Sequence, residues 1–295
     1  MQKLKPLGLI LGLICSTVMA TQELGVYSGD KPYIMMHLGG RLGNQMFQVA
    51  AALSLALDND AQAIFPDLVT RECENIPLNR KIFFSSLLAQ EPDSPVNFQY
   101  HEHEHFHYTP IPYRPNMEVY GYFQSEKYFK RHKKEVCEFF EPSEEIENYL
   151  LDKYQNLIEH PCTVAIHMRA FKLESLDIEK CFPFLTSQYY KKAMELFPQD
   201  VLFVIFSDRI DWAKEEMEGL DRPHVFIEGN EYYHDLYLMS FCKHQIISTS
   251  SFSWWAAYLN KNPDKVVVAP DPWFSPISGH DPSSVVPEDW YKMKW

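Results

Sequence analysis

The second half of the chain alternates between short apolar segments and segments of helical composition. After Pro161, each segment rich in valine, isoleucine or phenylalanine is followed by one of helical character. The expected strands are residues 163–169, 201–208, 224–229, 244–250 and 265–270, and the expected helices are 187–197, 210–218, 235–242 and 252–260. Strands that alternate with helices form a mostly parallel sheet that helices cover on both faces. The expected fold class is therefore α/β.

The first half opens with a unit of the same kind. Residues 33–38 (YIMMHL) have the pattern of a strand, and a glycine turn (GGRLGNQ) and residues of helical composition follow. Strand, glycine turn and helix in this order begin a βαβ unit. Residues 70–160 are less regular, because prolines interrupt them. We expect two α/β domains, residues 26–155 and residues 156–295, that join near residue 155.

Residues 1–20 have the layout of a secretory signal. Lys3 and Lys5 precede an apolar run from Leu7 to Ala20, which ends in a small-x-small sequence, VMA. The run of about 14 residues is shorter than the roughly 20 that span a bilayer. We expect a signal peptide, with an uncleaved signal anchor as the alternative. Either one implies the secretory pathway or association with a membrane, and the cytosolic face of that membrane is one of the expected locations.

Composition and charge limit the partners of the chain. Hydrophobic residues make up 46% of it and aromatic residues 15%, which is enough for a sizeable core. The formal net charge of −13 argues against a nucleic acid or an anionic membrane as a partner for the whole surface. An anionic ligand would have to be met locally, by a few arginines or by a helix N-terminus.

The glycine turn is the first candidate site, because ligands of doubly wound sheets bind at the carboxyl ends of strands. Gly40 and Gly43 let the backbone turn tightly and approach a ligand. Arg41 can face an anion, and Asn44 can cap the helix that follows. The alternative is an ordinary strand-to-helix turn. The spacing does not match G-x-G-x-x-G, so the dinucleotide-binding fingerprint is absent.

Two further strand ends carry charged side chains. His167 and Arg169 lie two residues apart on one face of the strand 163–169, and an arginine there suits a phosphate or carboxylate. The alternative is a buried ion pair with a carboxylate. Ser207 and Asp208 end the next strand, where they either contact a ligand or cap the following helix.

A run of hydroxyl residues lies between the strand 244–250 and the helix after it. Residues 248–251 (STSS) offer hydroxyls and backbone N–H groups to an anion. Simple N-capping needs one such residue, so a run of four exceeds that need. Trp254 and Trp255, which follow in the helix, are expected to pack in the core rather than to contact a ligand.

Two patterns resemble metal sites. The tract HEHEHFH, from His101 to His107, would place histidines on one face of a strand. The tract lies in the proline-flanked region, however, and is not expected to bind a metal. The sequence Asp58-Asn59-Asp60 has a D-x-D pattern, but it follows a helix and is expected to be a polar turn.

Together these segments resemble the α-1,2-fucosyltransferases of glycosyltransferase family 11. The resemblance extends from about residue 33 to residue 291, with the motifs in the family's order. The matching stretches are GGRLGNQMFQVA, YGYFQSEKYF, IHMR, FSDRIDW, DLYLMSFCKHQIISTSSFSWWAAYLN, VVVAP with WF, and PEDW.

The resemblance implies a GT-B-like fold, in which two Rossmann-type domains face a cleft. It implies an inverting transferase that moves L-fucose from GDP-β-L-fucose to the 2-hydroxyl of a galactose-type acceptor glycan. The C-terminal half would bind the GDP-sugar and the N-terminal half the acceptor. Such enzymes need no metal and no other cofactor, and the implied partners are the donor and the acceptor glycan.

The resemblance also implies roles for particular residues. Arg169 would stabilise the charge that develops on the GDP β-phosphate. The other donor-binding residues would be Gly40, Arg41, Gly43, Asn44, His167, Asp208, Thr249, Ser250 and Ser251. Tyr122, Gln124 and Glu126 would belong to the acceptor side of the cleft. The proton acceptor would be Glu174 or Asp177, and Asp177 is preferred.

The chain departs from the family's motifs at three places. Where the family usually shows H-x-R-R-x-D, this chain has HMRAFK at residues 167–172, so Ala170 replaces the second arginine. Arg41, Lys172 or Arg209 would have to supply the missing charge. The usual F-S-D-D becomes FSDR at 206–209, and Thr249 replaces an asparagine. Two alternative functions follow: the use of another GDP-sugar or hydroxyl, and glycan binding with lapsed catalysis.

Overall fold

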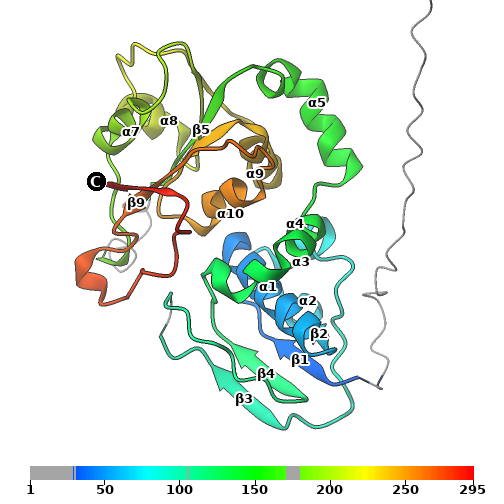
Figure 1. Ribbon diagram of the computed structural model, residues 1–295. Helices are drawn as coiled ribbons and strands as arrows, with labels where there is room; N and C mark the ends of the chain where they lie inside the picture. Colours follow the sequence, from blue (N-terminus) through cyan, green and yellow to red (C-terminus); the bar gives the residue numbers. More distant parts are fainter. Residues whose placement is uncertain (1–28, 30, 105, 171–179) are drawn as a thin grey trace, which may run out of the picture.

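The computed structural model describes residues 29, 31–104, 106–170 and 180–295. Two parallel β-sheets, each accompanied by helices, are connected by a long helix, α5 (Glu144–Ile158) (Figure 1). The predicted boundary near residue 155 lies within α5. The predicted signal segment, residues 1–20, lies outside the described residues. Within the described part of the chain, no helix combines the length and the apolar character needed to cross a membrane.

The first sheet has four parallel strands in the order β2-β1-β4-β3. Its strands are β1 (Tyr33–Met36), β2 (Gln62–Ile64), β3 (Phe98–His101) and β4 (Met117–Tyr120). The helices of this half are α1 (Leu42–Asp58), α2 (Asp67–Thr70), α3 (Ile76–Ile82) and α4 (Lys133–Phe139), with the 3-10 turns η1 (Glu126–Tyr128) and η2 (Lys130–His132). On β1, Ile34 and Met36 pack into the large core that includes α1, whereas Tyr33 and Met35 form a small cluster on the other face.

The second sheet has six parallel strands in the order β10-β9-β8-β5-β6-β7. Its strands are β5 (Thr163–Met168), β6 (Leu202–Ser207), β7 (His224–Phe226), β8 (His244–Ile246), β9 (Val267–Asp271) and β10 (Tyr291–Lys294). Its helices are α7 (Ser187–Met194), α8 (Ile210–Glu216), α9 (Tyr232–Phe241) and α10 (Ser251–Leu259), with the 3-10 turn η4 (Pro276–Ser278). All six residues of β5 are buried, as expected of a central strand covered on both faces.

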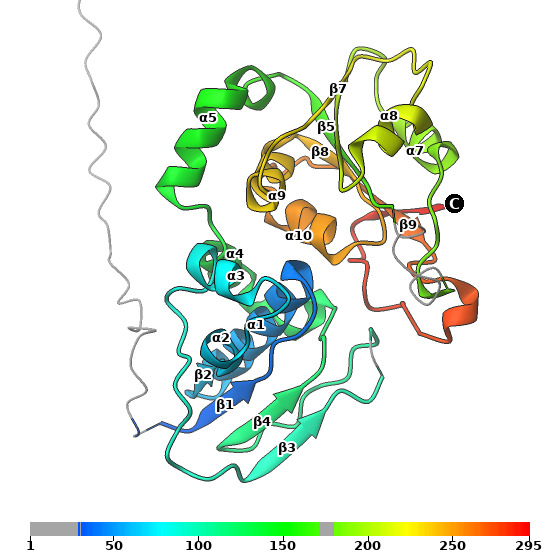
Figure 2. The same cartoon turned by 180° about the vertical axis from the view of Figure 1, so that it is seen from behind.

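One hydrophobic core joins the two halves. Figures 1 and 2 show from opposite sides that α1 and α10 lie next to each other. Phe47 of α1 packs on Trp254 and Trp255 of α10, with ring centroids 4.5 and 5.1 Å apart. Both tryptophans are fully buried, which confirms the prediction that they pack in the core. Because aromatic side chains bury large apolar areas, this contact stabilises the two sheets in one relative orientation.

The structure differs from the sequence expectations in the irregular regions. The strands β3 and β4 and the helix α5 were not predicted between residues 70 and 160, and neither was β10. The strand expected over 244–250 ends at Ile246, because residues 247–250 form the turn that leads to the N-cap of α10, Ser250. The helix expected from residue 235 begins at Tyr232.

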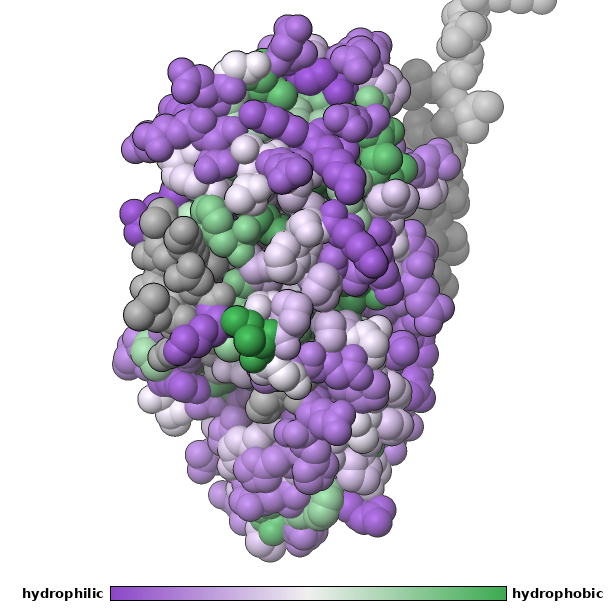
Figure 3. Space-filling view, turned by 90° about the vertical axis from the view of Figure 1, so that its left-hand side faces the viewer, coloured by the Kyte–Doolittle hydropathy of each residue, from purple (hydrophilic) through white to green (hydrophobic). Residues whose placement is uncertain are grey.

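Hydrophilic residues predominate on the face shown in Figure 3, with small hydrophobic areas between them.

Candidate active site

A cavity of about 940 Å³ lies between the two sheets, and residues from both halves line it. Its walls include the turns that follow β1, β5, β6, β8 and β9, at the carboxyl ends of these parallel strands. Twelve of the predicted site residues line this one cavity: Gly40, Arg41, Gly43, Asn44, Tyr122, Gln124, His167, Arg169, Asp208, Thr249, Ser250 and Ser251. The roles assigned to them stay predictions, but their grouping identifies the cavity as the candidate active site.

The N-terminal ends of α1 and α10 meet at the wall of the cavity. Asn44 Oδ1 accepts hydrogen bonds from Ser251 Oγ (2.9 Å) and from Gln124 Nε2 (2.8 Å). The carbonyl of Gly43 accepts a hydrogen bond from the buried Trp255 Nε1 at 3.1 Å. A Cβ atom on Gly43 would lie 2.6 Å from the Ser251 carbonyl carbon, so only glycine permits this approach. Two helix N-termini thus direct their partial positive charge to one region.

The turn before α1 is held by hydrogen bonds from side chains behind it. Gly40 has a φ of +72°, which glycine adopts without strain. Its N–H donates to Glu74 Oε1 (3.0 Å), and its carbonyl accepts from Gln45 Nε2 (2.7 Å). Asn79 Nδ2 donates to Gln45 Oε1 at 2.7 Å and Tyr232 OH donates to Asn79 Oδ1 at 2.5 Å, so α9 of the second half supports this turn of the first.

Arg169 lies directly after β5 and forms an ion pair with Asp208 after β6. Arg169 Nη1 donates to Asp208 Oδ2 at 2.6 Å, and the N–H of Ala170 donates to the other carboxylate oxygen at 3.1 Å. The ion pair that was the alternative interpretation of Arg169 is therefore present. A guanidinium carries five N–H donors, so one hydrogen bond to Asp208 does not exhaust its capacity for an anion. Asp208 instead fixes the orientation of the guanidinium at the cavity wall.

His167 is buried beside this pair and is uncharged at neutral pH. Its Nδ1 lies 3.1 Å from Ser248 Oγ. Burial lowers the pKa of His167 to about 4, although the charge of Asp208 acts in the opposite direction. His167 therefore offers hydrogen bonds rather than positive charge.

In the hydroxyl run after β8, Ser248, Thr249 and Ser250 are buried, and Thr249, Ser250 and Ser251 line the cavity. Ser250 is the N-cap of α10, yet its side chain forms no capping hydrogen bond. Thr249 Oγ1 is buried and has no hydrogen-bond partner within the part of the chain that the structure describes. Buried hydroxyls are nearly always paired. The unpaired one therefore fits a site in which a ligand supplies the partner.

The predicted acceptor-side residues separate in the structure. Tyr122 and Gln124 line the cavity, and the backbone N–H of Tyr122 donates to the buried Glu102 Oε2 at 2.7 Å. Glu126 does not line the cavity, because it lies in η1 and its carboxylate pairs with Lys130 Nζ at 3.0 Å. The two candidate bases, Glu174 and Asp177, and the candidate cation Lys172 lie outside the described residues.

Sequence reasoning missed several residues of the cavity. Asp235, in the first turn of α9, accepts a hydrogen bond from Asn230 Nδ2 at 2.9 Å. Burial raises the pKa of the Asp235 carboxyl to about 6. The sequence did contain an indication of Asp235, since this residue begins the stretch DLYLMS that matches the family. An aromatic group was also missed, because it comes from loops without a periodic pattern: Phe106, Phe182, Phe274 and His280.

The two metal-like patterns have other partners. Asp58 accepts a hydrogen bond from His132 Nε2 at 2.8 Å, and Asp60 pairs with Lys31. The ring of His101 stacks on Tyr120 with centroids 4.5 Å apart. Among residues 31–104, 106–170 and 180–295, no three His, Cys, Asp or Glu side chains are grouped as a metal site would require. The independence from metal stays a prediction.

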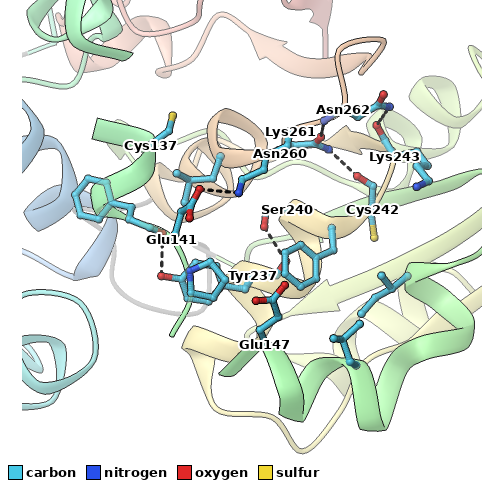
Figure 4. Close-up of a pocket in the computed structure, with 16 residues that line it drawn as sticks. Cys137, Glu141, Glu147, Tyr237, Ser240, Cys242, Lys243, Asn260, Lys261 and Asn262 are labelled. Carbon is cyan, nitrogen blue, oxygen red and sulfur yellow. Dashed lines mark hydrogen bonds and ion pairs between the residues drawn. The ribbon is translucent and has the colours of Figure 1, made fainter. Parts of the chain in front are cut away.

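A second cavity, of about 440 Å³, lies between α4, α5, α9 and α10 and shares no lining residue with the first (Figure 4). Many of its polar groups bond to each other. Lys261 Nζ pairs with Glu141 Oε1 at 2.6 Å, and Asn260 Nδ2 donates to the carbonyl of Cys242 at 2.6 Å. These contacts fasten the chain before α5 to the second half, which is a structural role.

Two parallel sheets that face a shared cavity, with an arginine and two helix N-termini at its walls, are typical of α/β proteins that bind an anionic ligand. The chain belongs to glycosyl transferase family 11, because the model of that family matches residues 14–295. It is thus a glycosyltransferase of this family.

Two curated relatives show the range of the similarity. An alpha-1,2-colitosyltransferase of Escherichia coli is 26% identical over an alignment of 310 residues, which covers 88% of this chain and 99% of that protein. Galactoside alpha-(1,2)-fucosyltransferase 2 of Oryctolagus cuniculus is 24% identical over 75% of this chain and 65% of that protein.

Solved structures share the fold. The fucosyltransferase NodZ from Bradyrhizobium superposes with a TM-score of 0.51 at 13% identity, over 77% of this chain and 92% of that one. A mutant of FUT1 from Arabidopsis thaliana in complex with GDP superposes with a TM-score of 0.53 at 13% identity, over 92% of this chain and 78% of that one. The predicted GT-B-like α/β fold, with two Rossmann-type domains that face a cleft, is confirmed.

Proposed function

We propose that this glycosyltransferase moves L-fucose from GDP-β-L-fucose to the 2-hydroxyl of a galactose-type acceptor, with inversion at the fucose anomeric carbon. The observation that carries the proposal is the meeting of the α1 and α10 N-termini at the wall of a cavity that Arg169 also lines, because these groups together provide positive charge for a diphosphate. Relatives named for α-1,2 transfer of colitose and fucose support the linkage. A structural neighbour was soaked with GDP-fucose, which supports the donor.

In the proposed reaction, the acceptor oxygen attacks the anomeric carbon as the bond from that carbon to the β-phosphate oxygen breaks. The bonding electron pair stays on the departing GDP, and the acceptor hydroxyl gives its proton to a base. Arg169, the N-terminus of α10 and the hydroxyls of Thr249 and Ser250 would stabilise the charge on the diphosphate. We keep Asp177 or Glu174 as the proposed base.

The nucleoside is proposed to face the end of the cavity near α9. Asp235 and Glu74 line this end, and their carboxylates accept hydrogen bonds. Guanine presents two adjacent N–H donors, N1–H and N2–H, on one edge. A carboxylate there would favour guanine over bases that lack this pair of donors. Asp235 is the better placed of the two. It accepts a hydrogen bond from the neutral Asn230 Nδ2, whereas Glu74 accepts from the N–H of Gly40 and its charge is paired with Arg71 Nη2 at 3.3 Å.

The missing second arginine is proposed to be replaced by Arg41. Of the three candidate cations, Arg41 lines the cavity, Arg209 is an exposed residue outside the lining, and Lys172 lies outside the described residues. Ala170 is buried and uses its backbone N–H on Asp208, so it contributes no charge. Arg41 would therefore share the diphosphate with Arg169.

A second candidate donor is a GDP-activated 3,6-dideoxyhexose, because the relative that covers 88% of this chain is named a colitosyltransferase. Colitose differs from fucose by the absence of the 3-hydroxyl. A glycan-binding protein with lapsed catalysis is the remaining alternative, motivated by Ala170.

The test is to incubate the protein with GDP-fucose or GDP-colitose and methyl β-D-galactoside, and to follow GDP release and the linkage of the product. The proposal expects an α-1,2-fucosylated product, and it expects turnover to persist in the presence of EDTA. Turnover with GDP-colitose alone would replace the donor. Binding of the galactoside without turnover of either donor would favour the lapsed enzyme. The mass of the mature N-terminus would show whether the proposed signal segment is removed or remains as a membrane anchor.

A further inference from the structure

Aromatic side chains from both halves gather at one end of the cavity. Phe106 and Tyr122 come from the first half, and Phe182, Phe274 and His280 come from the second. This group, the aromatic end, is assembled from four separate stretches of sequence: those after β3, after β4, before α7 and after β9. Phe274 is buried, whereas the other four are half-buried and present part of their surface to the cavity.

Phe106 is the centre of the aromatic end. Its ring centroid lies 4.3 Å from that of Phe274, 4.9 Å from that of His280 and 6.4 Å from that of Tyr122. The planes of Phe106 and Tyr122 are parallel to within 6°. Phe182 adds a further contact to Phe274, with centroids 5.3 Å apart. Rings of the two halves therefore make one continuous wall.

The backbone at Phe106 is strained, and neighbouring contacts hold it in place. Its φ of +74° lies in the left-handed region, which is unfavourable for a bulky side chain. The next residue, His107, lies 2.9 Å from Asp281 Oδ2 and 3.3 Å from Ser283 Oγ. Both views of the ribbon show the loop after β3 reaching toward the segment that carries η4 (Figures 1 and 2). Strain of this kind clusters at sites where it positions a functional group.

Strand order separates the aromatic end from the residues proposed for the nucleoside. Phe274 follows β9 and Asp235 follows β7, and these two strands lie on opposite sides of β5 in the second sheet. The side-chain Oδ1 of Asn44 accepts hydrogen bonds from both Ser251 Oγ and Gln124 Nε2, and Gln124 leads along the chain to Tyr122. A donor with its diphosphate at Arg169 and its base near Asp235 therefore leaves the aromatic end for the acceptor.

We propose that the aromatic end is the acceptor subsite and that it takes the terminal hexopyranose of the glycan by stacking. This inference rests on the proposed function for the direction of transfer. A β-galactoside carries the C3–H, C4–H and C5–H groups on one face, and this apolar face packs on the electron-rich face of an aromatic ring. The opposite face and the 2-hydroxyl then remain directed toward the donor. Tyr122 and His280 add polar groups at the rim of the aromatic end.

The decisive variant is Phe106→Leu, which retains an apolar side chain of similar size but removes the ring. With GDP-fucose saturating, we expect the KM for methyl β-D-galactoside to rise about tenfold, as loss of a stacking contact would give. We expect kcat, the Kd of GDP and the slow hydrolysis of GDP-fucose in water to change less than about twofold. Phe106→Tyr retains a ring and should restore the KM. Phe139→Leu, a half-buried phenylalanine of α4 outside the cavity, is the matched control and should leave all four quantities unchanged.

A binding measurement separates this inference from the proposed function. Saturation-transfer NMR of methyl β-D-galactoside with the GDP-loaded protein should show the strongest signals at H3, H4 and H5, and these should disappear in Phe106→Leu. That result supports the subsite even if GDP-fucose proves not to be the donor. An unchanged KM in Phe106→Leu, weaker GDP binding by this variant, or absence of galactoside binding to the wild-type protein would each overturn the subsite.

Discussion

Asn44 in the first turn of α1 and Ser251 at the start of α10 share a hydrogen bond of 2.9 Å across 207 positions of sequence. This bond brings together the N-termini of two helices that follow strands of different sheets. Anions bind at helix N-termini, so the relationship places the strongest part of the candidate site at the contact between the two halves. The binding of a donor and the packing of the halves should therefore depend on the same few residues.

Gly43 provides the first prediction. Its carbonyl bonds to Trp255, and an added Cβ would lie within 2.7 Å of three atoms of Ser251 and Phe252. Gly43→Ala should therefore separate α1 from α10, lower the free energy of unfolding by about 1–3 kcal/mol and weaken GDP binding. Urea unfolding and calorimetric titration with GDP measure both effects.

Gly39→Ala is the control for this substitution. A Cβ there would meet nothing nearer than 3.9 Å, so stability and affinity should stay close to those of the wild type. Equal effects of the two substitutions would show that the close approach at Gly43 is not what joins the halves.

The arginines provide the second prediction. Arg169→Ala and Arg41→Ala should each weaken GDP binding about tenfold or more, as expected for the loss of hydrogen bonds to a charged group. Arg209→Ala should leave the Kd unchanged, because Arg209 is exposed and does not line the cavity. Isothermal titration of GDP against the three variants measures this. Loss of affinity in Arg209→Ala with none in Arg41→Ala would contradict the proposal that Arg41 supplies the replacement charge.

The alternation of strands and helices was predictable because it is local. In the second half, each expected strand and helix is present, since buried β-branched runs and helical segments carry their own periodicity. The strands β3 and β4 were not recognised, because each has only four residues and prolines lie nearby. The paired ends of α1 and α10 were each recognised as candidate sites. That they meet depends on strand order and sheet packing, which no single segment encodes.

The residues that sequence reasoning missed share a physical cause. Asp235 was assigned to the start of a helix, and only the observed start at Tyr232 and the burial of its carboxyl identify it as part of the cavity wall. Phe106 and Phe274 lie in loops whose conformation depends on contacts between the halves. Hydrophobic periodicity carries no information on such loops. Arg169 was predicted as a site residue. Its pairing with Asp208 was not predictable, because it depends on β5 and β6 being neighbours in the sheet.

His167 provides the third prediction. Its pKa of about 4 in the folded protein lies below the 6.5 of an unfolded chain, so the unfolded state binds a proton first as the pH falls. The stability that His167 contributes is complete above pH 6.5 and is lost between pH 6.5 and 4, by up to about 3 kcal/mol. His167→Asn keeps a polar atom near Ser248 and should remove this component from the curve of unfolding free energy against pH.

The exposed His224 is the control for that measurement. The curve of His167→Asn is compared with that of His224→Asn, which removes a histidine at an exposed position outside the cavity. A His167→Asn curve that still falls as steeply as the wild-type curve between pH 6.5 and 4 would mean that other groups cause the loss.

Asp235 provides the last prediction, which concerns the donor. Burial raises the pKa of its carboxyl to about 6, and the proposed hydrogen bonds to guanine require the ionised form. Binding of GDP-fucose, whose diphosphate does not titrate near pH 6, should be strongest above pH 6 and weaken by about tenfold per pH unit below it. Asp235→Asn should bind weakly, with little change of Kd between pH 5 and 7.5, whereas Asp211→Asn, in the first turn of α8, should behave as the wild type. Calorimetric titration at a series of pH values measures these curves. A wild-type Kd that stays constant down to pH 5 would exclude the ionised carboxylate from donor recognition.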